Sequence, residues 1–178
     1  MASNPLSNYN PATDDDDRDL VAAWLKWDTT RIVAGALAGL FAGILMMAFA
    51  MIFAKIMGYE VLFPVKYAAV PVLGGEALRF ENTTAVLVGF IVHEVLCAVL
   101  GMFYAHFTAT NSLPALLGYG LVWGIFSWIF ISNLFTPAFF DLAAINLPKS
   151  VFLPVNLVFG LGLPAVAFFD RSLRGKEA

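Results

Sequence analysis

Four apolar stretches, each of about 20 residues, dominate this sequence of 178 residues. A helix needs about 20 apolar residues, at about 1.5 Å per residue, to cross the roughly 30 Å hydrocarbon core of a bilayer. The composition agrees, because 60% of the residues are apolar and only 13% are charged, whereas soluble domains carry about 25% charged residues. We therefore predict an all-α integral membrane four-helix bundle, with spans at residues 32–54, 84–107, 113–135 and 151–169.

The residues before the first span predict a polar leader and an interfacial helix. Residues 1–18 are acidic and rich in Pro and Asn, a composition typical of disorder. A single membrane domain is then expected over residues 19–178. At its start, Trp24 and Trp27 lie on one side of a short amphipathic segment. Tryptophan favours the headgroup region, so this segment is predicted to be a helix anchored at the membrane surface.

Prolines interrupt the apolar sequence at two places. The connection GYEVLFPVKYAAVPVLGGEAL, between the first and second spans, contains Pro64 and Pro71. Because the residue before a proline avoids the α conformation, we expect an irregular segment that lies on or dips into the membrane interface. Pro137 is expected to end the third span, since proline lacks a backbone N–H.

Lysine and arginine counts near the span ends predict the orientation. One side of the membrane would carry Arg18, Lys26, Arg31, Arg171, Arg174 and Lys176, and the other Lys55, Lys66, Arg79 and Lys149. The larger set belongs to the side with both termini, which predicts that both termini are cytoplasmic.

Glycines recur at helical spacing and predict close helix contacts. They are Gly35, Gly39 and Gly43 in the first span, Gly89 and Gly101 in the second, and Gly120 and Gly124 in the third. The pair in the third span follows Gly39 and Gly43 by 81 residues. One interpretation is a duplicated two-helix unit whose small-residue faces pack at the centre. The other is that any four-span chain looks duplicated, because glycine is common in membrane helices.

The run GFIVHEVLCAVLG places an imidazole and a carboxyl group near the middle of the second span. His93 shares a stripe of small residues with Gly89, Cys97 and Gly101, so it is expected to face another helix. A bare carboxylate at this depth costs about 2.5 to 3.5 kcal/mol, so Glu94 must be neutral, paired or hydrated. Hydrogen-bond partners are expected on the third and fourth spans, namely Ser127, Ser132, Asn133 and Asn156.

This pair has two interpretations. His93 and Glu94 either handle protons or contact a substrate, or they form an interhelical contact that fixes the register. Single polar groups in membrane bundles commonly make modest packing contacts.

The sequence offers no motif for catalysis or cofactor binding. It lacks G-x-S-x-G, H-E-x-x-H and a phosphate-binding glycine loop, and HEVLC has Cys97 where the zinc motif needs histidine. The two histidines, His93 and His106, lie about 20 Å apart along one helix, too far to bind one haem iron. A net charge of −3 without a basic stripe gives no support for nucleic-acid binding. We expect no enzymatic activity, no metal and no cofactor.

Three features occur together over residues 31–169: the glycine-rich first span, the proline-containing apolar connection, and the openings GFIVHE and LLGYGLVWG of the next two spans. In this combination the chain resembles the small four-helix bacterial inner-membrane proteins grouped around YagU. The resemblance implies a four-helix bundle and carries over no catalytic residue.

The sequence has many residues suited to helix contacts and no catalytic motif. It therefore favours a non-enzymatic accessory or scaffolding subunit of a larger energy-transducing or transport complex. The alternative is a small homo-oligomeric transporter or proton-coupled carrier that uses Glu94 and His93. The expected partners are the lipid bilayer and either another membrane protein or further copies of this chain.

Overall fold

The computed structural model describes residues 26–108, 110–139 and 149–175, and within these ranges it contains helices and no strands. Four helical segments are long and apolar enough to cross a membrane, which confirms the prediction of an all-α chain with four helices of membrane-spanning length. The first two segments are the single helices α2 (Thr29–Ile56) and α5 (Thr83–Phe107). The third, Leu113–Leu134, consists of α6 (Leu113–Phe130) and most of the π-helical η2 (Ile131–Phe135). The fourth, Phe152–Arg174, consists of α8 (Phe152–Gly162), η4 (Leu163–Ala165) and α9 (Val166–Arg174). Most of the predicted interfacial helix, including Trp24, lies outside the described residues.

The first two long helices begin at side-chain caps. Asp28 Oδ1 accepts a hydrogen bond of 3.1 Å from the backbone N–H of Arg31, and Asn82 Oδ1 accepts one of 3.0 Å from that of Ala85. Each cap satisfies one of the N–H groups that the first turn of a helix leaves unpaired. These caps fix the residues at which α2 and α5 begin.

The connection between α2 and α5 is itself helical. It contains α3 (Phe63–Ala68), α4 (Val70–Leu73) and the 3₁₀ turn η1 (Gly74–Leu78). Pro64 and Pro71 each lie in the first turn of one of these short helices, where a missing N–H costs no hydrogen bond. The prolines therefore begin helices here and do not leave the backbone irregular.

Pro137 does not stop the helix as predicted, although the apolar span ends at Leu134, close to its predicted end at residue 135. The helix passes through η2 and continues as α7 (Thr136–Phe139). The wider π turn changes the hydrogen-bonding register just before the proline, so Pro137 lies in a first turn, where its missing donor is tolerated.

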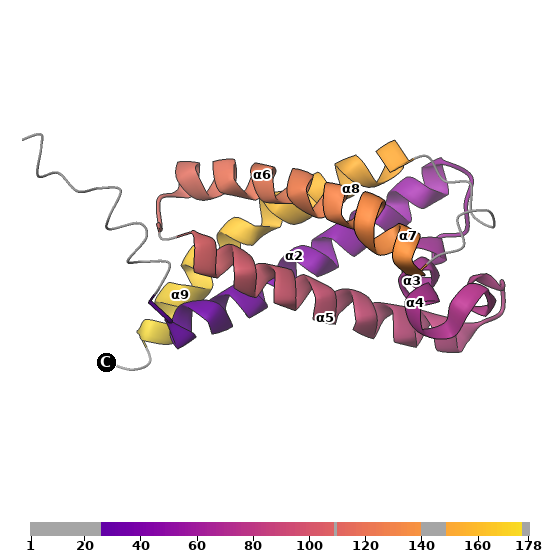
Figure 1. The fold of residues 1–178 in the computed structure, drawn as a ribbon, viewed down its shortest axis with the longest axis horizontal. Coiled ribbons are helices and arrows are strands. Elements are labelled where there is room, and N and C mark those ends of the chain that lie inside the picture. The colour runs from indigo at the N-terminus through magenta and orange to yellow at the C-terminus, as the bar shows by residue number, and fades with distance from the viewer. Residues whose placement is uncertain (1–25, 109, 140–148, 176–178) are drawn as a thin grey trace, which may run out of the picture.

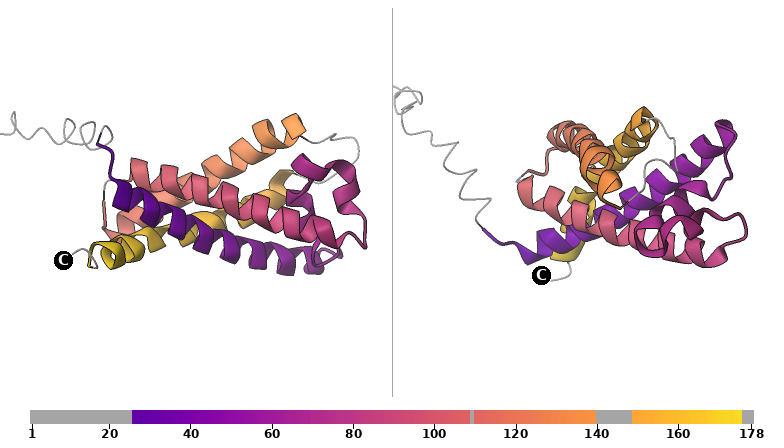
Figure 2. Two further views of the ribbon diagram at one scale, coloured as in Figure 1. Left: turned by 90° about the horizontal axis from the view of Figure 1, so that it is seen from below. Right: turned by 45° about the vertical axis from the view of Figure 1, so that its right-hand side comes forward.

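The long helices lie in the spatial order α5, α2, α8, α6, each antiparallel to the next (Figure 1). Consecutive helices α5 and α6 meet through aromatic side chains near their connection, with ring centroids of Tyr104 and Trp123 6.1 Å apart. The Tyr104 hydroxyl also donates a 2.7 Å hydrogen bond to the carbonyl of Leu116. Toward the end that carries α3 and α4, α5 and α6 diverge (Figure 2, left).

Glycines set the contacts within each helical hairpin. A Cβ on Gly39 would overlap the carbonyl oxygen of Cys97, and one on Gly101 would lie 2.7 Å from the Cα of Gly39. In the other hairpin, a Cβ on Gly120 would overlap the carbonyl oxygen of Gly160. The structure also places glycines in tight contacts at Gly35 and Gly43 against α5, at Gly124 against α8, and at Gly89 against α3.

This arrangement corrects the expectation that the two glycine faces pack on each other at the centre. The faces of α2 and α6 turn instead to the second helix of their own hairpins. The hairpins join through α2 and α8, where Gly162 lies against Ala42.

Replacing Gly39 with Ala should destabilise the protein by about 1–3 kcal/mol, because the added methyl group meets backbone that cannot move aside cheaply. Gly118→Ala is the matched control, since a Cβ there has no heavy atom within 4 Å, and alanine favours a helix over glycine by about 0.5–1 kcal/mol. Unfolding of the detergent-solubilised protein measures both. Equal stability of the two variants would contradict the close backbone contact.

Candidate functional site

His93 and Glu94 lie where α5 crosses Gly43 of α2. The Nε2 atom of His93 lies 3.1 Å from the carbonyl oxygen of Gly43. A carbonyl can only accept, so Nε2 carries a proton and donates it. Cys97 Sγ lies 3.5 Å from the same nitrogen. The imidazole therefore ties α5 to the backbone of α2, as the packing interpretation requires.

The carboxyl group of Glu94 occupies space left by the absent side chain of Gly43. A Cβ on Gly43 would lie 3.0 Å from Glu94 Oε2. Glu94 is only 8% exposed, and its nearest cation-forming atom is His93 Nε2, 4.0 Å from Oε1. Both carboxyl oxygens are buried without a hydrogen-bond partner. An unpaired buried carboxylate is costly, so this environment favours the neutral acid.

The partners predicted for Glu94 are not brought to it. Ser127 Oγ, Ser132 Oγ and Asn156 Oδ1 are each buried without a hydrogen-bond partner. The Asn133 amide is exposed and donates a hydrogen bond of 3.1 Å to the carbonyl of Ile129 in its own helix. These four side chains are on or near the other hairpin, and α5 is separated from it where the helices diverge.

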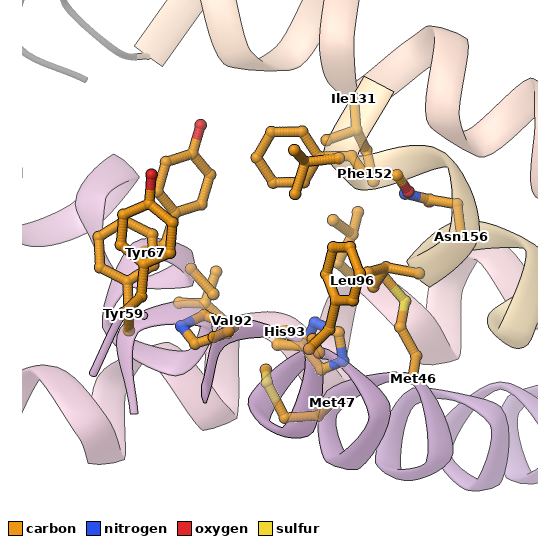
Figure 3. Close-up of a pocket in the computed structure, with 18 of the residues that line it drawn as sticks. Met46, Met47, Tyr59, Tyr67, Val92, His93, Leu96, Ile131, Phe152 and Asn156 are labelled. Carbon is orange, nitrogen blue, oxygen red and sulfur yellow. The ribbon is translucent and has the colours of Figure 1, made fainter. Parts of the chain in front are cut away.

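A cavity of about 150 Å³ fills this divergence. It is partly open and is lined mainly by α2, α3, α5 and α8 together with Ile131 of η2, and this lining is almost entirely apolar and aromatic (Figure 3). His93 lines one side, and Asn156 lies on the side formed by α8. This cavity could not be predicted from the sequence, because its walls come from segments far apart in the chain.

A network of two arginines and two aspartates closes the end of the bundle near both described termini. Arg31 donates to the carbonyl oxygens of Ala105 and Thr108, at 3.2 and 3.1 Å from Nε, and so caps the C-terminus of α5. Its Nη1 lies 3.5 Å from the buried carboxylate of Asp170. Arg174 then bridges Asp170, at 3.0 Å, and Asp28, at 2.6 Å.

Asp28 shows how this network balances burial against charge. Burial works to raise the pKa of its carboxyl group, but the backbone N–H of Arg31 and the guanidinium of Arg174 hold the pKa below its ordinary value. Because the pKa of Asp28 is lower in the folded than in the unfolded protein, its ionised carboxylate stabilises the fold fully at pH values above the ordinary, unfolded-state pKa. This stabilisation is lost as the pH falls through the lower, folded-state pKa. The ion pair between Asp28 and Arg174 is therefore fully formed at neutral pH.

Trp27, predicted as an interfacial anchor, is exposed at this same end. Its ring centroid lies 5.8 Å from that of His106, which is in the last turn of α5. Asp28 N-caps α2 directly after it. Trp27 is thus held at the boundary of the first two spans.

Lys66 closes the opposite end and is 1% exposed. Its ammonium group lies 2.8 Å from Glu60 Oε1 and 3.1 Å from the carbonyl oxygen of Arg79. It also donates to the carbonyl of Phe80 and lies 5.6 Å from the centroid of that ring. A buried charge needs this set of partners, and the set joins α3 to the chain entering α5. Sequence reasoning missed these contacts, because the partners of Lys66 lie 6, 13 and 14 residues away along the chain and at no helical pairing distance.

Lys66→Met should destabilise the protein by on the order of 3 kcal/mol, because removing one member of a buried pair leaves the other groups without a partner. Lys55→Met is the control, since Lys55 is an exposed lysine in the last turn of α2 and surface changes are usually within about 0.5 kcal/mol. Denaturation of the purified protein in detergent distinguishes them. Equal effects would show that the Lys66 contacts contribute no more than a surface charge.

Among the described residues, no three His, Cys, Asp or Glu side chains come together as a metal site requires. In comparisons with known proteins, no protein-family model, no curated protein and no solved structure matches this chain.

Proposed function

We propose that this chain is a non-enzymatic integral membrane protein that serves as an accessory or scaffolding subunit of a larger membrane complex. The observation that carries the proposal is the packing of α6. Among the long helices it packs closely against α8, and it meets α5 through aromatic side chains at one end. Most of its circumference is left for contacts outside this chain.

The exposed side of α6 combines a long apolar stripe with one amide. Val122, Phe126, Ile129 and Asn133 follow one another at helical spacing and are all exposed. Lipid suits the first three side chains, and Asn133 adds an exposed amide to this stripe; polar groups inside membrane spans usually face protein and not lipid. The π turn at Ile131–Phe135, a form often found at functional positions, presents Asn133 on this stripe.

The ionisable side chains inside and at the ends of the bundle support a structural role. His93 ties α5 to α2, Arg31 caps α5, and Lys66 holds the helical connection. Each of these groups is used to join segments of the same chain. This use fits a protein whose task is to present a stable helical surface.

The proposed setting is a bacterial inner membrane with both termini cytoplasmic, as the resemblance to YagU-like proteins and the lysine and arginine count favour. In this orientation the Arg31 and Arg174 network lies at the cytoplasmic face. Trp27, which lies just before α2 and outside any helix, would lie at that surface, and α3 and α4 would cover the opposite face.

Single cysteines test the α6 surface, starting from Cys97→Ala to remove the only native cysteine. Each cysteine is labelled with a thiol-reactive photocrosslinker. Labelled Val122→Cys, at a position 65% exposed on α6, should crosslink in native membranes to one discrete polypeptide. Labelled Val95→Cys, at a position 59% exposed on α5, is the matched control and should give adducts with lipid only. Lipid adducts at both positions, with a solitary monomer in native mass measurement, would refute the proposal. An adduct with a second copy would favour the homo-oligomeric alternative.

The second candidate function is a small proton-coupled carrier, and the cavity beside His93 favours it. If Glu94 carries protons, Glu94→Gln should abolish proton-coupled flux in liposomes while folding is retained. Glu94→Met should leave stability unchanged or raise it by about 1 kcal/mol, because the carboxyl group has no partner to lose. Flux that survives Glu94→Gln excludes this candidate.

A further inference from the structure

The cavity between the two hairpins contains one polar group whose hydrogen-bonding capacity is half used. Asn156 is 1% exposed. Its Nδ2 donates a hydrogen bond of 2.8 Å to the carbonyl of Phe152, one turn earlier in α8. Its Oδ1 is buried without a hydrogen-bond partner. Turning the amide over would place two oxygens against each other, so the bond to Phe152 fixes Oδ1 as the unsatisfied atom. Figure 3 shows the amide directed from α8 toward the cavity.

The walls of the cavity suit a flat apolar group. Tyr67 and Phe152 have ring centroids 5.5 Å apart across α3 and α8, and Phe63 stacks on Tyr59 at 5.2 Å. Met46 and Met47 are also part of the lining, and methionine adapts its shape and contacts aromatic rings favourably. These walls supply offset aromatic contacts of the kind that rings prefer.

The size of the cavity sets the size of its occupant. Its volume of about 150 Å³ equals that of an engineered apolar cavity that stays dry and binds benzene. The cavity therefore holds about one six-membered ring. A charged group is disfavoured because the lining is apolar, and the open position at Asn156 is an acceptor, so it selects a donor.

We propose that this cavity binds a neutral, hydroxyl-bearing ring compound of the phenol type, with the ring between the aromatic walls and the hydroxyl donating to Asn156 Oδ1. Such a molecule reaches the site through the lipid, in which it is soluble. This binding site is independent of the subunit role proposed above, because it uses the interior of the bundle and not the outer side of α6.

Two probes that differ only in the hydroxyl test the assignment, phenol and benzene. With the full-length protein in detergent, calorimetry should show saturable binding of both and roughly tenfold tighter binding of the phenol, as one hydrogen bond of about 1.4 kcal/mol gives. Asn156→Leu keeps a similar side-chain volume but removes the acceptor, so this variant should bind the two probes with roughly equal affinity. A preference that survives Asn156→Leu would overturn the assignment of the hydroxyl.

A pair of tryptophan variants locates the binding independently of Asn156. Leu96→Trp fills the cavity from α5 and should abolish binding of both probes. Leu161→Trp places the same bulk on α8 at a position that is 49% exposed and does not line the cavity, and it should bind both probes as the wild type does. Absence of saturable binding to the wild type, or equal affinities of the two tryptophan variants, would overturn the proposal.

Discussion

Backbone-to-backbone contact at glycine is the constraint on which the rest of this structure depends. In lipid, helices gain little from burying apolar side chains, because the tails of the bilayer are equally apolar. Dispersion contacts between close backbones must supply the association, and these require residues without side chains. Gly39 and Gly101 provide them in one hairpin, and Gly120 and Gly160 in the other. Each hairpin can therefore form a tight contact before the two hairpins join.

The polar ties then secure the ends of the bundle, where the glycine contacts stop. Arg31 joins α2 to the end of α5 and to Asp170 of α9, so one side chain links the first, second and last spans. Lys66 performs the corresponding task at the other end, within the connection of the first hairpin. Both cations lie against carbonyl oxygens as well as carboxylates, which makes their burial tolerable in a low-dielectric region.

The sequence predicted the elements of this fold well because hydropathy and helix length are local properties. The fourth span was the exception, since it was expected to end at residue 169 but continues to Arg174. Asp170 and Arg174 resemble the polar end of a span when read alone. Their helical turn persists because Arg31, from the start of the chain, pairs with Asp170. The partners of Glu94 and the cavity were missed for the same reason, as both depend on how distant segments meet.

The cavity follows from the placement of the glycines. Along α2 the last glycine is Gly43, and the next turns present Met46, Met47 and Ala50 to the interior. Along α6 the last glycine is Gly124, beyond which Ile131 enters the cavity lining. Helices held at backbone distance on one side of these positions must separate on the other, because larger side chains now lie between them. Asn156 and His93 line the space that this separation opens, so the contacts that hold each hairpin together also create an interior space that can receive a ligand.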